Sequence, residues 1–161
     1  MENLRALFGG EAPSDTSALL EQAVQSYADT GEAERLLWQA HRASPDALPV
    51  YFSLYKFYFY KGDLENAGLS ARMALLAAAR QGAFDADWRE LTAASADWTK
   101  YDGPAHFYLF SLKALAFIRL RQGARAEAQA ILDKLAEIDS SDSVGASVIR
   151  SMAAGATDGP A

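Results

Sequence analysis

The sequence predicts an all-α protein built as a stack of helical hairpins. Along most of the chain, apolar residues recur at spacings of three and four, which place them on one face of an α-helix. Three segments also align on a glycine, at Gly31, Gly62 and Gly123, and each glycine lies between two such periodic stretches. All the periodicity is close to 3.6 residues, so we expect no strands.

The composition limits the class of protein. With 161 residues, half of them hydrophobic, the chain is long enough for one domain with a substantial core. The net charge of −6, with acidic residues in excess in both halves, argues against nucleic acid as a partner. The absence of cysteine excludes disulfides and thiolate zinc sites, and it fits a reducing cytoplasm.

The chain shows no membrane or export signal, so we expect no membrane partner and a cytoplasmic location. No segment approaches the roughly 20 apolar residues of a membrane span. The first residues, MENLRALFGGEAPSD, lack the apolar core of a secretory signal peptide.

We predict an N-terminal arm over 1–15, a single helical domain over 16–154 and a flexible tail over 155–161.

The periodic stretches predict eight helices. They are expected near residues 16–30, 32–43, 48–61, 63–80, 85–98, 104–122, 124–138 and 142–154. Gly31 and Gly62 separate the first four as left-handed helix stops. The acidic residues just after them, Glu32 and Asp63, suit the positive N-terminus of the next helix.

The remaining helices follow from a change in spacing. The interval from Gly62 to Gly123 is 61 residues, against 31 from Gly31 to Gly62, so an extra helix is inserted over 85–98. Its predicted apolar face consists of Trp88, Leu91, Ala94 and Trp98. The next helix opens at Pro104, a residue favoured in a first helical turn. The segment 142–154 has the length to cover the end of a stack.

Three in-phase units carry a family resemblance. The matching residues are Leu20, Tyr27, Gly31 and Ala40 in the first unit, Tyr51, Leu54, Tyr58, Gly62, Ala67, Ala71 and Ala74 in the second, and Leu112, Leu115, Ala116, Gly123, Ala128 and Leu135 in the third. This pattern resembles the tetratricopeptide repeat (TPR) family over roughly residues 16–140, although Arg119 stands where the third unit should have a tyrosine. The resemblance implies a TPR-like solenoid of helical hairpins, an α-α superhelix, with an inserted helix between the second and third units.

A second resemblance lies in the segments DWRELTAASADW and FYLFSLKALAFIRLR. They are similar to small uncharacterised TPR-like proteins encoded among bacterial nitrogen-fixation genes. That resemblance implies a bacterial protein but supplies no site residues.

The helix over 48–61 has two aromatic faces. The first face, with Tyr51, Leu54, Tyr55 and Tyr58, coincides with the residues that pack helix against helix in TPR units. By the same resemblance, the second face and its counterpart in the third unit would line a concave groove. These groove residues are Phe52, Lys56, Phe59, Tyr60, Phe110, Lys113, Phe117 and Arg121. They predict a protein or peptide partner with apolar and acidic residues, unless the rings are internal core or are covered by the N-terminal ENLRALF or by a second copy in a homodimer.

No constellation of residues supports catalysis. Neither His41 nor His106 has a second histidine or a carboxylate at a helical ligand spacing. No phosphate loop or nucleophile elbow is present. We therefore expect no catalytic residue, no metal and no cofactor, and the chain is not expected to be an enzyme.

Three functional hypotheses remain open. The first is a protein interaction scaffold or assembly factor that binds a partner segment in the aromatic and basic groove. The second is a dedicated chaperone of the kind that serves secretion systems. The third is a small-molecule binder or enzyme that uses a pocket near Trp88, Trp98 and His106.

Overall fold

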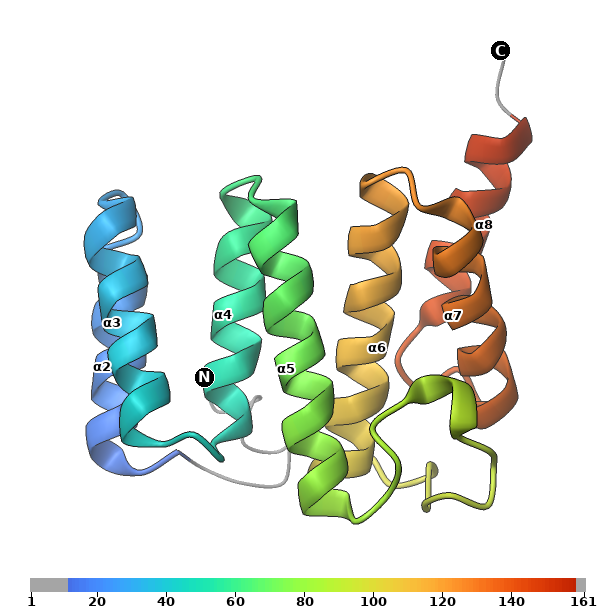
Figure 1. The fold of residues 1–161 in the computed structure, drawn as a ribbon, viewed down its shortest axis with the longest axis horizontal. Helices are drawn as coiled ribbons and strands as arrows, with labels where there is room; N and C mark the ends of the chain where they lie inside the picture. The colour runs from blue at the N-terminus through green and yellow to red at the C-terminus, as the bar shows by residue number, and fades with distance from the viewer. Residues whose placement is uncertain (1–11, 159–161) are drawn as a thin grey trace.

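The computed structural model of the chain describes residues 12–158, and within them it is helical without any strand. The helices are α2 (Ser14–Gln25), α3 (Thr30–Ala43), α4 (Leu48–Tyr60), α5 (Leu64–Gly82), α6 (Gly103–Arg121), α7 (Arg125–Ile138) and α8 (Ala146–Asp158), with one 3-10 turn, η1 (Trp88–Glu90). Figure 1 shows them side by side in a row that runs from α2 and α3 to α7 and α8. The all-α prediction is confirmed over these residues.

The first and last described helices reach into the segments predicted as arm and tail. Helix α2 begins at Ser14, inside the predicted arm over 1–15, and α8 continues to Asp158, into the predicted tail over 155–161. The rest of the arm, including ENLRALF, lies outside the described residues. No helix within residues 12–158 has the length and apolar character needed to cross a membrane.

The inserted helix predicted over 85–98 is wrong. This segment is a loop, and its regular structure is limited to the three residues of η1. Its side chains take the backbone hydrogen bonds that a helix would need: Asp87 accepts from the Arg89 amide at 3.0 Å, and Thr92 Oγ1 accepts from the Ala94 amide at 3.2 Å. Short polar side chains compete with the helical backbone in this way.

The apolar residues of the loop are nevertheless anchored in the core. Trp88, Leu91 and Trp98 are buried, whereas Ala94 is exposed. The Trp98 indole donates a hydrogen bond to the Thr92 carbonyl at 2.9 Å, which closes the loop on itself. The spacing of the large residues therefore predicted their burial correctly but not the backbone that carries them.

Two of the three aligned glycines have the predicted conformation. Gly62 and Gly123 have φ of 79° and 81°, in the left-handed region that glycine reaches at little cost. Gly31 instead lies in the first turn of α3, so its predicted role as a helix stop is wrong. Helix α2 already ends at Gln25, and Asp29 caps the start of α3 by accepting a hydrogen bond from the Glu32 amide at 3.1 Å, so Gly31 does not lie at a helix C-terminus.

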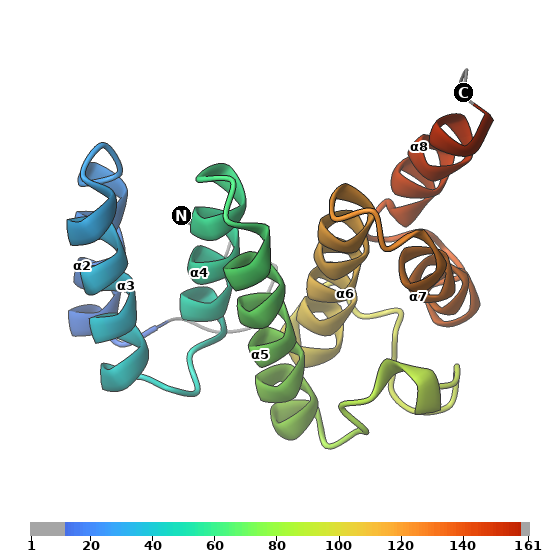
Figure 2. The ribbon, with the colours of Figure 1, turned by 45° about the horizontal axis from the view of Figure 1, so that its top comes forward.

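Helices α5 and α6 form the centre of the core. Figure 2 shows α5 packed against both α4 and α6, and α6 also contacts α7 and α8. On α5, Ala67, Ala71 and Ala74 are fully buried, because their small side chains let neighbouring helices approach closely. Around α6 the buried side chains are Phe107, Tyr108, Leu109, Leu112, Leu115 and Ile118. A helix that is apolar on nearly all sides belongs at the centre of a core.

The C-terminus of α5 contains a strained residue. Ala83 caps this helix with φ of 60° and ψ of 45°, a left-handed conformation that a Cβ atom disfavours. We expect Ala83→Gly to raise the free energy of unfolding by about 0.5–1 kcal/mol, measured by chemical denaturation. Ala130→Gly, at an exposed position inside α7, should lower it by a similar amount. A loss of stability in both variants would contradict the strain at Ala83.

Candidate interaction surface

Helices α4 and α6 bring the two predicted sets of groove residues together. The Phe52 and Phe110 ring centroids are 5.9 Å apart, and those of Phe59 and Phe117 are 5.3 Å apart. Each pair joins one ring of α4 to one ring of α6. Residues more than 50 positions apart in the sequence therefore form one continuous aromatic surface.

Cations lie over these rings. The Lys113 ammonium is 4.6 Å from the centroid of Phe110, and the Lys56 ammonium is 5.5 Å from that of Phe52. At the other end the Arg121 guanidinium is 5.8 Å from the centroid of Phe59. These distances are within the range of cation–π attraction. We call the eight predicted residues, which include Tyr60 beside Lys56 and Phe59, the aromatic strip.

The aromatic strip is the edge of the core and continues onto the surface. All four phenylalanines are partly buried against core residues. Lys56, Arg121 and Tyr60 are exposed, and Tyr60 is 69% exposed. The aromatic strip therefore has features of both alternatives. Its phenylalanine rings are half-buried against the core, and Lys56 and Arg121 beside them are exposed.

The cations of the strip have no carboxylate partner within the described part of the chain. Lys56, Lys113 and Arg121 form no ion pair there. Burial lowers the pKa of Lys113, while the more distant charge of Asp142 opposes this shift. Cations without a carboxylate partner, of which Lys113 is half-buried, favour the approach of an acidic group.

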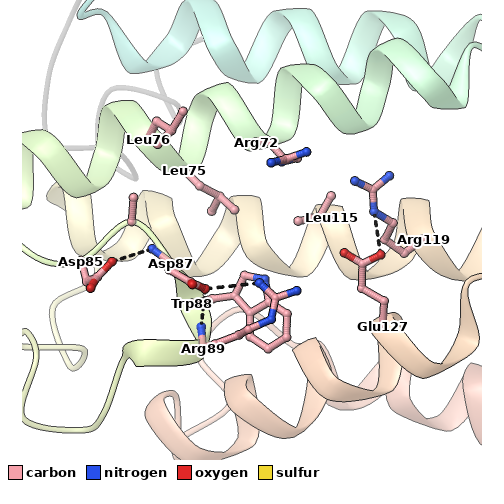
Figure 3. A pocket seen from close by; sticks show the side chains of 11 residues that line it. Arg72, Leu75, Leu76, Asp85, Asp87, Trp88, Arg89, Leu115, Arg119 and Glu127 are labelled. Carbon is pink, nitrogen blue, oxygen red and sulfur yellow. Dashed lines mark hydrogen bonds and ion pairs between the residues drawn. The ribbon is translucent and has the colours of Figure 1, made fainter.

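A pocket lies apart from the aromatic strip, between α5, α6, α7 and the loop around η1. It has a volume of about 540 Å³. Its lining residues are Arg72, Leu75, Leu76, Asp85, Ala86, Asp87, Trp88, Arg89, Leu115, Arg119 and Glu127, as Figure 3 shows. The pocket is bounded by both apolar and charged side chains.

This pocket differs from the one predicted near Trp88, Trp98 and His106. Trp88 lines it, but Trp98 packs against Phe84 at 5.2 Å between ring centroids, and His106 is buried in the first turns of α6. Of the predicted trio, Trp88 alone is among the residues that line this pocket. The segment that the sequence placed in an inserted helix is a loop, so the pocket is not bounded by an α-helix there.

The histidines lie in separate structural settings. His41 lies near the C-terminus of α3, where its Nε2 atom is 3.3 Å from the Tyr51 hydroxyl. His106 Nδ1 is buried without a hydrogen-bond partner among the described residues. Burial lowers the pKa of both rings. No group of histidine, aspartate and glutamate side chains within residues 12–158 is arranged to hold a metal ion.

Comparison with known proteins gives one informative relative. The chain is 32% identical over 129 residues to a protein of Azotobacter chroococcum mcd 1 described as "Uncharacterized 19.8 kDa protein in nifW 5'region". The match covers 79% of this chain and 72% of the relative. The chain belongs to the family of this nifW-region protein.

Membership of the nifW-region family agrees with the resemblance to nitrogen-fixation gene clusters noted in the sequence. No family model matches the chain. No solved structure matches it either.

Proposed function

We propose that this protein is an interaction scaffold or assembly factor, and that it binds a segment of a partner protein along the aromatic strip. The observation that carries the proposal is the joining of rings from α4 and α6 into one surface, with cations that have no ion-pair partner among residues 12–158. Rings supply contact area at a low cost in conformational entropy. The cations would fix the register of the bound segment.

The chemistry of the strip defines the kind of partner. An apolar side chain could pack against the half-buried rings, and a neighbouring carboxylate could pair with Lys56, Lys113 or Arg121. Such a pairing is favourable here because these cations have no ion-pair partner within residues 12–158. The expected partner segment therefore alternates apolar and acidic residues.

We further propose that the helices form a TPR-like solenoid. The left-handed conformation of Gly62 and Gly123 and the burial of Ala67 and Ala128 support this proposal. In that arrangement α4 and α6 would be the first helices of two successive units, which carry the peptide-binding face in TPR proteins. The strip lies on these two helices.

The nifW-region relative suggests where the partner should be sought. That relative is described by the position of its gene in the nifW 5' region. We propose by extension that the partner of this chain acts in nitrogen fixation. Affinity capture from cells grown under nitrogen-fixing conditions would supply candidate partners for quantitative binding.

The decisive test is charge reversal on the strip. We expect the double variant Lys56→Glu, Lys113→Glu to bind the captured partner at least about tenfold more weakly than the wild type, because two attractions become repulsions. Its binding should also lose part of its dependence on salt. Isothermal titration at several salt concentrations measures both effects.

The matched control reverses two exposed cations outside the strip. Lys100→Glu, Arg125→Glu changes the net charge by the same amount and should bind nearly as tightly as the wild type. If the strip variant and the wild type show the same dissociation constant and salt dependence, the aromatic strip is not the binding site.

A further inference from the structure

The pocket between α5, α6 and α7 has the size and walls of a small-molecule site. Its volume of about 540 Å³ lies within the usual range for such sites, roughly 300–1,000 Å³. Three of its lining side chains, Leu75, Leu115 and Trp88, are buried and apolar. They would form a surface for the body of a ligand.

Two arginines from different helices lie at one wall of the pocket. A Cβ atom at Gly68 would come within 2.8 Å of an Arg119 terminal nitrogen, so the missing side chain leaves room for this guanidinium against α5. Arg72 lies one turn further along the same face of α5. Figure 3 shows the two guanidinium groups on the same side of the pocket.

These two arginines are incompletely satisfied. Arg119 Nε lies 3.3 Å from a Glu127 oxygen, but this buried nitrogen makes no hydrogen bond, so the contact is an ion pair only. Another Arg119 nitrogen donates to Gln122 at 2.8 Å. Arg72 makes no hydrogen bond or ion pair with any residue from 12 to 158. The wall therefore retains donors for a ligand.

The acidic residues of the pocket are engaged in its own structure. Asp85 accepts from the Asp87 amide at 2.9 Å, and Asp87 accepts from the Arg89 amide at 3.0 Å. Arg89 in turn stacks on Trp88, with its guanidinium carbon 4.5 Å from the ring centroid. These contacts hold the loop around η1 that forms one side of the pocket. Arg72 and Arg119, on the opposite helices, are the groups available to an anion.

We propose that this pocket binds a small organic acid. Its carboxylate pairs with Arg72 and Arg119, and its apolar or aromatic body lies against Leu75, Leu115 and Trp88. The pocket lining as a whole is neutral, because Arg72, Arg89 and Arg119 are balanced by Asp85, Asp87 and Glu127. The two guanidinium groups of Arg72 and Arg119 share their wall with the single Glu127 carboxylate, so this wall carries one excess positive charge and favours a singly charged anion. Guanidinium groups match a carboxylate in geometry as well as in charge.

The first experiment uses 2-naphthoate and its neutral analogue 2-naphthamide with the full chain. We expect saturable binding of 2-naphthoate by isothermal titration, and at least about tenfold weaker binding of 2-naphthamide. In ¹⁵N-resolved spectra the indole resonance of Trp88 should shift on binding, and those of Trp38 and Trp98 should stay in place. No binding at millimolar naphthoate, or equal affinity for the neutral analogue, would overturn the proposal.

The second experiment removes the exposed arginine. Arg72→Gln should weaken naphthoate binding at least about tenfold, whereas Arg80→Gln, at another exposed position on α5, should leave it unchanged. The strip variant Lys56→Glu, Lys113→Glu should also bind naphthoate as the wild type does, so this test is independent of the partner proposal. Equal affinities of the Arg72 and Arg80 variants would refute the assigned anion site.

Discussion

Replacing Ala128 by leucine is expected to lower the free energy of unfolding by about 1–3 kcal/mol, and Ala67→Leu should have an effect of the same size. Both alanines have 0% exposed surface, and they lie on α7 and α5, which pack against α6. Three additional carbon atoms at either position would force the helices apart or drive side chains out of their preferred rotamers. Chemical denaturation measures the change.

The control for this prediction lies on the same helix. Ala130 is exposed on α7, two residues from Ala128, so Ala130→Leu adds the same volume without a helix to displace. Its stability should stay within about 0.5 kcal/mol of the wild type. If Ala128→Leu and Ala130→Leu were equally stable, the alanine column would not mark a close approach of helices.

The helical positions could be predicted because local signals and packing agree. Around Gly62, the left-handed turn, the Asp63 cap and the buried Ala67 all specify the same helix boundary. At Gly31 the signals conflict, since Asp29 two residues earlier already caps α3. Because α2 ends at Gln25 and α3 begins at Thr30, Gly31 falls inside α3 rather than at a helix C-terminus.

The loop over 83–102 could not be predicted from apolar spacing alone. Trp88, Leu91 and Trp98 are spaced as on a helix face, yet they are buried by a chain whose backbone is held by Asp87 and Thr92. Spacing reports which residues face the core. It does not report whether short polar side chains will take over the backbone hydrogen bonds.

The two candidate sites differ in how far the sequence reveals them. The aromatic strip was predictable because its residues repeat with the helical period on two equivalent helices. The arginine pocket was missed, since Arg72, Trp88 and Arg119 come from three segments with no shared pattern. One signal was visible: Arg119 replaces the tyrosine expected in its column. The Arg119 side chain fits against α5 because Gly68 has no Cβ atom there. This contact becomes visible only when α5 is packed against α6.

Three buried tyrosines should make the protein sensitive to alkali. Tyr55 lies wholly inside the core with its hydroxyl 3.3 Å from Ser111 Oγ, and burial strongly raises the pKa of this phenol. Burial also raises the pKa of Tyr58 to about 12, assisted by its hydrogen bond to Glu34 at 2.6 Å. The pKa of Tyr108, whose hydroxyl donates to the Ala86 carbonyl, is raised by burial as well.

The direction of the effect follows from proton linkage. Above pH 10 the unfolded chain releases these phenolic protons and the native chain retains them, so the unfolded state binds fewer protons and stability falls as pH rises. Each such tyrosine removes about 1.4 kcal/mol per pH unit between its unfolded and folded pKa values.

Denaturation between pH 9 and pH 12 should therefore show a steep loss of stability in the wild type and a shallower loss in Tyr55→Phe. The variant lacks one of the three buried phenols, so above pH 10 its slope should be smaller by about 1.4 kcal/mol per pH unit, even if its stability at pH 8 also differs. Tyr60→Phe is the control, because this ring is 69% exposed, and its slope should match that of the wild type. Parallel curves for all three proteins would show that Tyr55 is not held protonated in the native core.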